Sequence, residues 1–379
     1  MAPQPFYTDR GTPIAVGLLL RALCEAGHKV DLLTYPEGND VEIEGLRIYR
    51  VHKVPFIKHV TVGFSWQKLV YDFLMIFRML GLVRSHRYQV IHAVEESVFI
   101  AAMVSPFVRA RLVYDMDSSM ADQLSEKWTA LRVLRPVFEW FECLAVKRSD
   151  VVLPVCKALA EKVHRHCPDR KMFILEDVAL ESDEQLDSAE DLRTELGIDG
   201  LVVVYVGNLE HYQGVDLLLQ VMEQLQSEPS LHLVIIGGSQ GDVRKYRART
   251  EQMNISGKVH LLGPRPVGQL AYYLKQADIL VSPRTKGKNT PMKIYSYMAS
   301  GKPVLATEIY SHTQVLDSTC ACLVKADAAS IASGLKALAD NEEMRGRLGN
   351  AAAVRAAANH TYDAFQHKLL EAYNYLDSL

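Results

Sequence analysis

One stretch, Ser282-Pro-Arg-Thr-Lys-Gly-Lys-Asn-Thr-Pro-Met-Lys-Ile-Tyr-Ser-Tyr-Met-Ala-Ser-Gly-Lys-Pro-Val-Leu-Ala-Thr307, decides how the rest of the chain is interpreted. An apolar strand predicted over 277–281 enters it, and a loop rich in Gly, Asn and Pro follows. A helix is predicted to begin at about Pro291, because proline is favoured in the first turn, and to end at residues 300–301. Free backbone N–H groups and the positive end of the helix dipole then lie beside Arg284, Lys288 and Lys293, which suits an anion.

This stretch resembles the sugar-nucleotide loop of the family-4 retaining glycosyltransferases, which have the two-Rossmann-domain architecture called GT-B. The family usually has a Glu, seven residues, a second Glu, and then Ala-Met-Ala-x-Gly-x-Pro-Val. Here the tail is intact from Tyr297 to Val304, but Ser296 stands at the second Glu and Lys288 stands eight residues earlier. The resemblance continues through most of the chain. It implies an α/β fold of the GT-B class, with two Rossmann-like domains facing across a cleft.

Size and composition agree with a two-domain soluble protein. The chain has 379 residues, of which 49% are apolar and 23% charged, and its net charge is −3. That charge gives no reason to expect nucleic acid as a partner. The six cysteines have neither C-x-x-C nor metal spacing, which predicts reduced thiols in the cytoplasm. Neither a membrane-spanning run nor a secretion signal is recognised, and no P-loop or dinucleotide-binding motif is present.

The start of the chain predicts an unusual sheet. A Rossmann-like domain opens with a buried strand, yet residues 2–13 already have loop composition, so we expect an N-terminal sheet without its usual first strand and with two exposed strand edges. A helix over 13–27 and a strand over 29–33 follow. Gly11 and Thr12 lie in the turn that the family resemblance places near the donor phosphates. The alternative is an ordinary tight turn.

Residues 51–87 have a distinct composition. Between positions 51 and 92, six Lys or Arg (53, 58, 68, 78, 84 and 87) accompany one acid, Asp72, and they alternate with bulky apolar residues. This pattern predicts an anionic membrane surface as a partner of 51–87, with peripheral association. The alternative is a buried helix whose basic side chains are solvated.

Two further strands, predicted over 88–93 and 111–114, end in polar clusters. Ligands bind at the carboxyl ends of parallel strands, so Glu96 and Asp117 are the candidate catalytic residues on the acceptor side. In the family a His is common near Asp117. The alternative is that Glu95, Glu96, Ser118 and Ser119 only stabilise the first turns of the following helices.

The second domain opens with an apolar strand, residues 201–206, that meets a glycine turn and a helix. This is a phosphate-binding unit. It resembles the family's Gly-Arg…Lys-Gly loop, with Asn208 and Gln213 in place of the two cations. We therefore expect charge to have moved from this loop to Arg284, Lys288 and Lys293. The donor-binding candidates are Gly11, Thr12, Gly207, Asn208, Gln213, Gly214, Gly238, Arg265, Arg284, Lys288, Asn289, Thr290, Pro291, Met292, Lys293 and Ser296.

The domain boundaries follow from an acidic segment over 176–200 and a terminal amphipathic helix. They are 1–178 for the acceptor-binding domain, 179–358 for the nucleotide-sugar-binding domain, and 359–379 for a helix that crosses back to the first domain. A long helix is predicted over 127–148.

The leading interpretation is a glycosyltransferase that moves a sugar from a nucleotide diphosphate sugar, by default a UDP-sugar, to a lipid or glycan acceptor at the membrane. Retention of configuration is implied by the resemblance, and neither a cofactor nor a divalent metal is expected. Two alternatives remain: a nucleotide-sugar epimerase, and a catalytically weak partner subunit of another glycosyltransferase.

Overall fold

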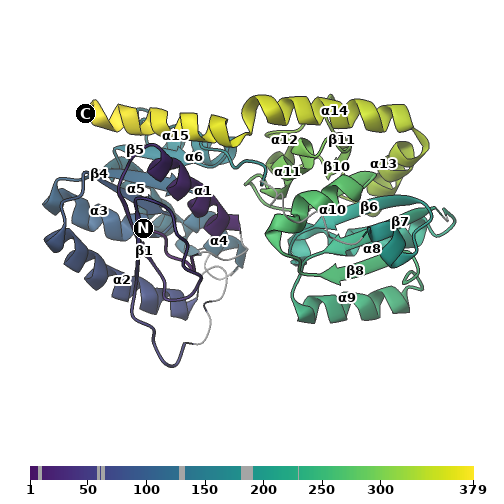
Figure 1. Cartoon of the computed structure of the whole chain (residues 1–379), viewed down its shortest axis with the longest axis horizontal. Coiled ribbons are helices and arrows are strands. Elements are labelled where there is room, and N and C mark those ends of the chain that lie inside the picture. Colours follow the sequence, from purple (N-terminus) through teal and green to yellow (C-terminus); the bar gives the residue numbers. More distant parts are fainter. Residues whose placement is uncertain (7–10, 58–59, 61–64, 128–132, 181–190, 229) are drawn as a thin grey trace. The chain divides into compact units, whose positions relative to one another are not determined.

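The computed structural model describes residues 1–6, 11–57, 60, 65–127, 133–180, 191–228 and 230–379. The chain divides into two compact units (Figure 1). Unit 1 contains Met1–Glu176 and Tyr362–Leu379, and unit 2 contains Asp177–Thr361. Both are α/β structures built on parallel strands, as the resemblance implies. The sequence placed the divisions at 178 and 358.

Unit 1 has parallel strands and helices in alternation. Its strands are β1 (Val30–Thr34), β2 (Leu46–Arg50), β3 (Val90–Val94), β4 (Arg111–Met116) and β5 (Val151–Pro154). Its helices are α1 (Gly11–Glu25), α2 (Trp66–Ser85), α3 (Ser97–Val108), α4 (Met120–Lys127), α5 (Arg135–Arg148), α6 (Lys157–His166) and α15 (Tyr362–Asp377). The terminal helix α15 packs against α1, so the last element of the chain completes the first unit.

The first two residues partly take the place of the missing first strand. No strand precedes α1 in the part of the chain that the structure describes. However, the Ala2 N–H donates to the Leu33 carbonyl at 3.0 Å, and the Val94 N–H donates to the Met1 carbonyl at 3.0 Å. Ala2 therefore bonds to β1, and Met1 bonds to β3. The expectation of two exposed strand edges is wrong, because backbone groups at both edges have partners.

The helix predicted over 127–148 is present from Arg135 to Arg148, and its predicted start at residue 127 is too early. The structure has two helices, α4 and α5, and α5 begins at Arg135 with a proline in its first turn. Pro136 has no N–H to donate, which costs nothing in the first turn of a helix, and this is where it lies in α5. The residues between the two helices lie partly outside the described ranges.

Unit 2 is a six-stranded parallel sheet in the order β11-β10-β9-β6-β7-β8. Its strands are β6 (Leu201–Val206), β7 (Leu231–Ile236), β8 (Val259–Gly263), β9 (Ile279–Ser282), β10 (Val304–Thr307) and β11 (Cys322–Val324). Its α-helices are α7 (Leu192–Leu196), α8 (Val215–Gln224), α9 (Gln240–Gln252), α10 (Leu270–Gln276), α11 (Lys293–Ala299), α12 (Tyr310–Thr313), α13 (Ala328–Asp340) and α14 (Glu342–Asn359). Apolar clusters bury both faces of the central strands, which explains why those strands are continuous apolar runs.

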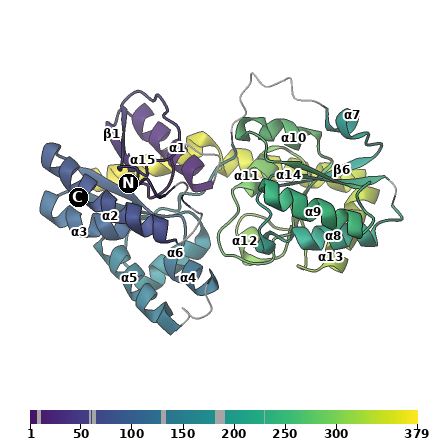
Figure 2. The ribbon, with the colours of Figure 1, turned by 90° about the horizontal axis from the view of Figure 1, so that it is seen from below.

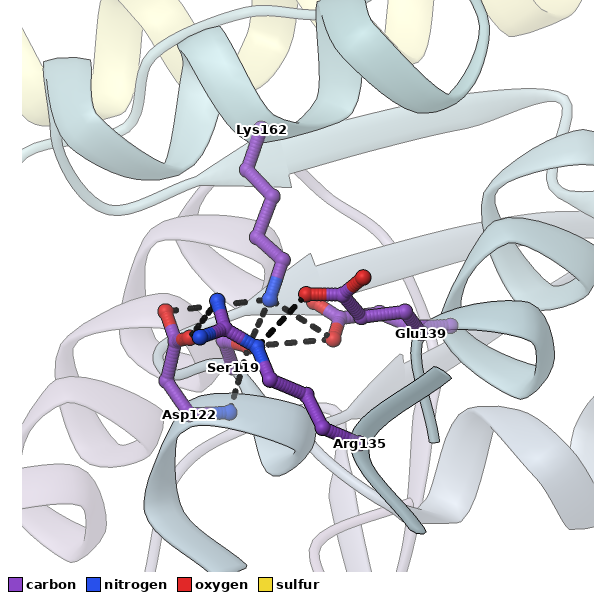
Figure 3. Close-up of polar contacts among 6 residues, drawn as sticks. Ser119, Asp122, Arg135, Glu139 and Lys162 are labelled. Atoms are coloured by element: carbon purple, nitrogen blue, oxygen red, sulfur yellow. Dashed lines mark hydrogen bonds and ion pairs between the residues drawn. The ribbon is translucent and has the colours of Figure 1, made fainter. Parts of the chain in front are cut away.

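A polar network is buried inside unit 1 (Figure 3). The Lys162 ammonium of α6 lies 3.1 Å from a carboxylate oxygen of Glu142 on α5, and both side chains are almost fully buried. Lys162 also donates to the Ser119 hydroxyl, and Ser119 in turn donates to Glu142 at 3.0 Å. At the edge of the network, Asp122 contacts the same ammonium at 3.7 Å. The network thus ties α5 and α6 to the start of α4.

Replacing Lys162 by Met is expected to destabilise unit 1 by about 3–5 kcal/mol, because the Glu142 charge then remains buried without its partner. Urea-induced unfolding measures the loss. Lys157→Met on the exposed side of the same helix is the control and should change stability by less than about 0.5 kcal/mol. Adding Glu142→Leu to Lys162→Met should restore most of the loss. Equal midpoints for Lys162→Met and Lys157→Met would show that the buried pair carries no such energy.

Candidate functional site

The carboxyl edge of the unit 2 sheet holds most of the predicted donor residues. The chain runs from β6 outward to β7 and β8, and then returns to β9 and runs outward the other way. The order therefore reverses between β6 and β9, which is where ligands bind in open parallel sheets. The loop after β6, residues 207–214, and the loop after β9, residues 283–292, both leave this point. We call them the β6 loop and the β9 loop.

Glycines allow the two loops to touch. Gly214 has φ +79°, and a Cβ there would lie 2.0 Å from the carbonyl oxygen of Pro283. Gly207 has φ +146°, and a Cβ there would lie 3.3 Å from the Lys293 Nζ. A side chain at position 214 would therefore push the loops apart. The Thr285 N–H completes the contact by donating to the Tyr212 carbonyl at 2.8 Å.

Lys293, the first residue of α11, reaches across to the β6 loop. Its Nζ donates to the Gln213 Oε1 at 3.3 Å and lies 4.0 Å from the centre of the Tyr205 ring. Burial, with a smaller contribution from the Arg284 charge, lowers the pKa of Lys293 well below its usual range. No carboxylate contributes to that shift. An anion bound here would favour the charged ammonium and would regain the energy that burial costs.

Arg284 contacts groups of both loops, whereas Lys288 bonds to Gln314, outside them, through its backbone carbonyl. The Arg284 guanidinium donates to the carbonyls of Lys286 at 2.7 Å and Asn289 at 3.0 Å, and it lies 5.2 Å from the Tyr212 ring centre. It therefore shapes the β9 loop and also places positive charge beside the β6 loop. The Lys288 side chain is exposed, and its carbonyl accepts from the Gln314 amide at 2.7 Å.

The serine at the family's second Glu position has a structural partner. The Ser296 hydroxyl oxygen accepts a hydrogen bond from the Leu180 N–H at 3.2 Å, where the chain enters unit 2. Helix α11 begins at Lys293 and not at Pro291, so Pro291 and Met292 belong to the β9 loop. Thr290 in that loop is buried.

The remaining donor candidates have local structural roles or lie in other turns. The Asn208 carbonyl accepts from the Tyr205 hydroxyl at 2.6 Å, which fixes the β6 loop from within. Gly238 follows β7 with φ +78°. Arg265 donates to the Leu262 carbonyl and to the Tyr273 hydroxyl and so holds the turn after β8. Gly11 and Thr12 lie in the first turn of α1 in unit 1, and residues 7–10 before them lie outside the described ranges.

His312 supports the site and was not among the sequence candidates. It is fully buried, its Nδ1 bonds to the Thr307 carbonyl at 2.8 Å, and its Nε2 bonds to the Ser282 hydroxyl at 3.0 Å. Burial lowers the pKa of His312 to about 3, and the charges of Lys293 and Arg284 act in the same direction. The ring is therefore neutral, with Nδ1 as donor and Nε2 as acceptor. It joins the ends of β9 and β10, and nothing in its local sequence indicated this.

The carboxyl edge of the unit 1 sheet holds the two candidate catalytic residues. Glu96 precedes α3 and forms an ion pair with Lys68 of α2, while Asp117 directly follows β4 and is half-buried. Glu96 lies at the N-terminus of α3 without a side-chain capping bond, so its charge can stabilise the helix dipole, as the alternative expected. Ser119 does cap α4, because its hydroxyl accepts from the Asp122 N–H at 3.2 Å.

Other acids gather at the same edge, and sequence reasoning did not select them. The Tyr35 hydroxyl donates to Asp72 at 2.6 Å, and the Ser118 hydroxyl donates to Glu95 at 3.0 Å. Burial, and then the negative charge of Glu96, raise the pKa of Asp72 to about 7. The same two causes raise the pKa of Glu95, whose backbone has φ +49°.

The two edges therefore differ in chemical character. The unit 2 edge offers the half-buried basic side chains of Arg284 and Lys293 together with backbone N–H groups, which suits a phosphate-bearing ligand. The unit 1 edge offers carboxyl groups that exchange protons near neutral pH, which suits hydroxyl groups as hydrogen-bonding partners. Among the described residues, no group of three His, Cys, Asp or Glu side chains is placed to hold a metal ion.

Asp72→Asn is expected to change how stability depends on pH. The folded protein holds a proton on Asp72 up to about pH 7, whereas the unfolded chain releases it near the ordinary pKa of 3.8. Between about pH 4 and pH 7 the unfolded carboxyl is ionised while the folded one is not, so stability falls as the pH rises through this window and stays low above it. The variant avoids that cost. Asp72→Asn should be more stable than wild type by about 1–3 kcal/mol at about pH 8, with the difference shrinking towards about pH 5.

The measurement is chemical unfolding at a series of pH values. The exposed Asp199→Asn serves as a control and should follow the wild-type curve throughout. Parallel curves for Asp72→Asn and wild type across the range would contradict the raised pKa.

Two family models match this chain. Glycosyl transferase 4-like domain matches residues 10–175, and Glycosyl transferases group 1 matches residues 188–355. The two matches follow one another along the chain and correspond to the two units.

Known proteins agree with these matches. The D-inositol 3-phosphate glycosyltransferase of Corynebacterium diphtheriae is 31% identical over 180 residues, which are 45% of this chain and 42% of that relative. The matched part thus spans less than half the length of that relative. Sucrose-phosphate synthase from Thermosynechococcus elongatus is 19% identical with a TM-score of 0.79, covering 97% of this chain and 94% of that one. Anabaena HepE, solved with UDP and glucose, is 15% identical with a TM-score of 0.72, covering 99% of each chain.

The structural similarities show a GT-B fold, and the family matches show a transferase. These matches favour a transferase over the epimerase alternative, whereas a partner subunit of another glycosyltransferase would match the same models. No described helix is both long enough and apolar enough to cross a bilayer. Taken with the two loops that meet at the switch point of unit 2, these findings place the chain among the family-4 glycosyltransferases of the GT-B fold.

Proposed function

We propose that this glycosyltransferase takes its sugar from a nucleotide diphosphate sugar, with UDP as the nucleotide, and transfers it to a lipid or glycan acceptor with retention of configuration. The observation that carries the donor proposal is the position of Lys293. Its Nζ lies against Gln213 and beside Gly207, in the loop where the family resemblance places two cations. A basic side chain thus reaches that loop, although the loop has no Lys or Arg of its own.

The physical argument concerns the leaving group. A departing nucleotide diphosphate gains negative charge as the bond to the sugar breaks, and preorganised donors stabilise that charge best in a desolvated site. Lys293 is half-buried and carries no carboxylate partner among the groups that shift its pKa. Arg284 adds a second positive charge and the β6 loop adds backbone N–H groups at the start of α8. This set provides the stabilisation without a divalent metal.

The choice of UDP rests on two structural neighbours. Anabaena HepE was solved with UDP and glucose, and an E. coli trehalose-6-phosphate protein was solved with UDP-2-fluoro glucose. Both are distant in sequence, so they support the choice of nucleotide only as precedents within the same fold. The sugar itself is left open.

On the acceptor side, we propose that the unit 1 edge binds hydroxyl groups. Asp117 follows β4 and Glu96 precedes α3, so both belong to the edge where parallel strands end. The Lys68 ion pair fixes the Glu96 carboxylate and offsets its charge, which suits a positioning role. Asp117 is the stronger candidate for direct contact with the acceptor. The enzyme would act at the cytoplasmic side of a membrane as a peripheral protein.

Lys293→Ala is expected to lower kcat/KM for the donor by about tenfold to about a hundredfold, because a hydrogen bond to a charged group contributes about 1.5–3 kcal/mol. Arg284→Ala should act in the same direction. The assay is release of UDP from a panel of UDP-sugars in the presence of a lipid extract. Direct UDP binding by calorimetry separates lost affinity from lost chemistry.

Lys286→Ala is the matched control. It removes an exposed lysine side chain from the same β9 loop, and only its backbone carbonyl contacts Arg284. Its UDP affinity and turnover should stay at the wild-type level. If Lys293→Ala and Arg284→Ala also keep wild-type donor affinity and turnover, the leaving group is stabilised elsewhere and the proposal is wrong.

A further inference from the structure

Exposed apolar side chains concentrate on three helices of unit 1. Helix α2 has two apolar sides: Tyr71, Met75 and Met79 are buried against the sheet, while Phe73 and Phe77 are 59% and 57% exposed. Trp66 and Leu69 continue the outer side at helical spacing. A helix that serves only the core would have polar residues on that outer side.

Helices α3 and α5 extend the same feature. Helix α3 has no charged residue over its whole length, and its Phe107 is 88% exposed, with Met103 one turn earlier also exposed. On α5, Trp140 and Phe141 are exposed, and Trp140 has 59% of its surface accessible. In unit 2, by contrast, the exposed large apolar residues described are only Tyr212, Tyr310 and Val354.

The three helices are neighbours. Helix α3 packs against α2 on one side and against α5 on the other. The Phe99 ring of α3 lies 6.4 Å from the Phe141 ring of α5, edge to face. Figure 1 shows α2 and α3 on the side of unit 1 away from α15, and Figure 2 shows α2, α3 and α5 together. We call the outer side of α2, α3 and α5 the three-helix surface.

The charges on these helices are mostly positive where they meet solvent. Arg78 and Arg84 of α2, Arg109 at the end of α3, and Lys147 and Arg148 in the last turn of α5 are exposed.

The acids of the same helices are held by other groups. Asp72 accepts from the Tyr35 hydroxyl, Glu139 is paired with Arg135, and Glu142 is buried beside Lys162. The charge that the three-helix surface presents is therefore basic.

We propose that the three-helix surface lies on an anionic lipid bilayer, with its aromatic side chains in the interface and its arginines and lysines at the headgroups. This rests on the proposed function in one respect: it names the membrane that presents the acceptor to unit 1. Aromatic side chains prefer the bilayer interface, and each nearby cation is attracted by anionic lipids. A second copy of the chain is a poorer occupant, because two such surfaces would bring like charges together.

This surface differs from the one that residues 51–87 alone predict. Lys68 is paired with Glu96 and so is not available to headgroups. Lys58 lies outside the described residues. Of that segment, helix α2 contributes its outer apolar side together with Arg78 and Arg84, while α3 and α5 add residues far along the chain. Helix α2 thus has one side buried in unit 1, as the second alternative expected, and an exposed apolar side, which lipid contact would require.

Vesicle sedimentation of the purified full-length protein, without any nucleotide sugar, tests the proposal. Wild type should bind vesicles of phosphatidylglycerol and phosphatidylcholine more tightly than vesicles of phosphatidylcholine alone, and salt should weaken the binding. Phe107→Ser should lower binding by about tenfold or more, since a buried Phe side chain contributes that much or more. Val354→Ser, an equally conservative change on exposed α14, should bind like wild type.

A second measurement tests whether Trp140 enters the bilayer interface. A variant with Trp66→Phe and Trp128→Phe keeps Trp140 as its only tryptophan, and its emission should shift to the blue when anionic vesicles are added. Thermal unfolding midpoints equal to wild type would show that Phe107→Ser is folded.

Three results would overturn the proposal: no binding to anionic vesicles at low salt, wild-type binding by folded Phe107→Ser, or a wild-type dimer in sedimentation velocity that Phe107→Ser separates. Because UDP binding by calorimetry is measured without lipid, failure here leaves the donor proposal intact.

Discussion

The contact between the β6 loop and the β9 loop is the constraint on which the unit 2 site depends. It forms where the strand order of the sheet reverses, and it requires that position 214 have no side chain, because the Pro283 carbonyl occupies that space. Once the loops touch, Lys293 can reach Gln213 and the Tyr205 ring, although these residues are far apart in the sequence. A close backbone approach thus decides where a charge can lie.

That charge is costly in the folded protein. Burial disfavours the ammonium of Lys293, and the neighbouring Arg284 adds to the cost. Such an unfavourable environment for a charged group is common where a ligand of opposite charge binds, because the ligand offsets the electrostatic cost. The neutral His312 ring beneath the loops adds no charge of its own and fixes the ends of β9 and β10.

Unit 1 shows the opposite electrostatic situation. Its strand ends gather Asp72, Glu95 and Glu96 around one cation, Lys68, and burial favours the protonated form of the first two. The same helix that supplies Asp72 and Lys68 also presents aromatic side chains to solvent on its other side. Helix α2 therefore connects the inner edge of the sheet with the outer surface of the unit.

Much of the fold could be predicted from the sequence, because the signals involved are local. Apolar runs such as residues 201–206 indicate strands buried on both faces, and glycine and proline mark the ends of elements such as α11. Local chemistry also led to the hypothesis that Arg284, Lys288 and Lys293 replace the two cations missing from the β6 loop. It placed the start of α5 at residue 127, whereas the structure begins that helix at Arg135, next to Pro136.

The tertiary structure decided which groups meet. Only packing shows that Lys293 lies in the site while the Lys288 side chain is exposed, or that Lys68 pairs with Glu96. Only packing brings Ala2 beside Leu33, so that a strand edge expected to be open is bonded. The physical reason is that pairing and desolvation depend on neighbours dozens of residues away, whereas spacing along the chain records only periodicity and turn chemistry.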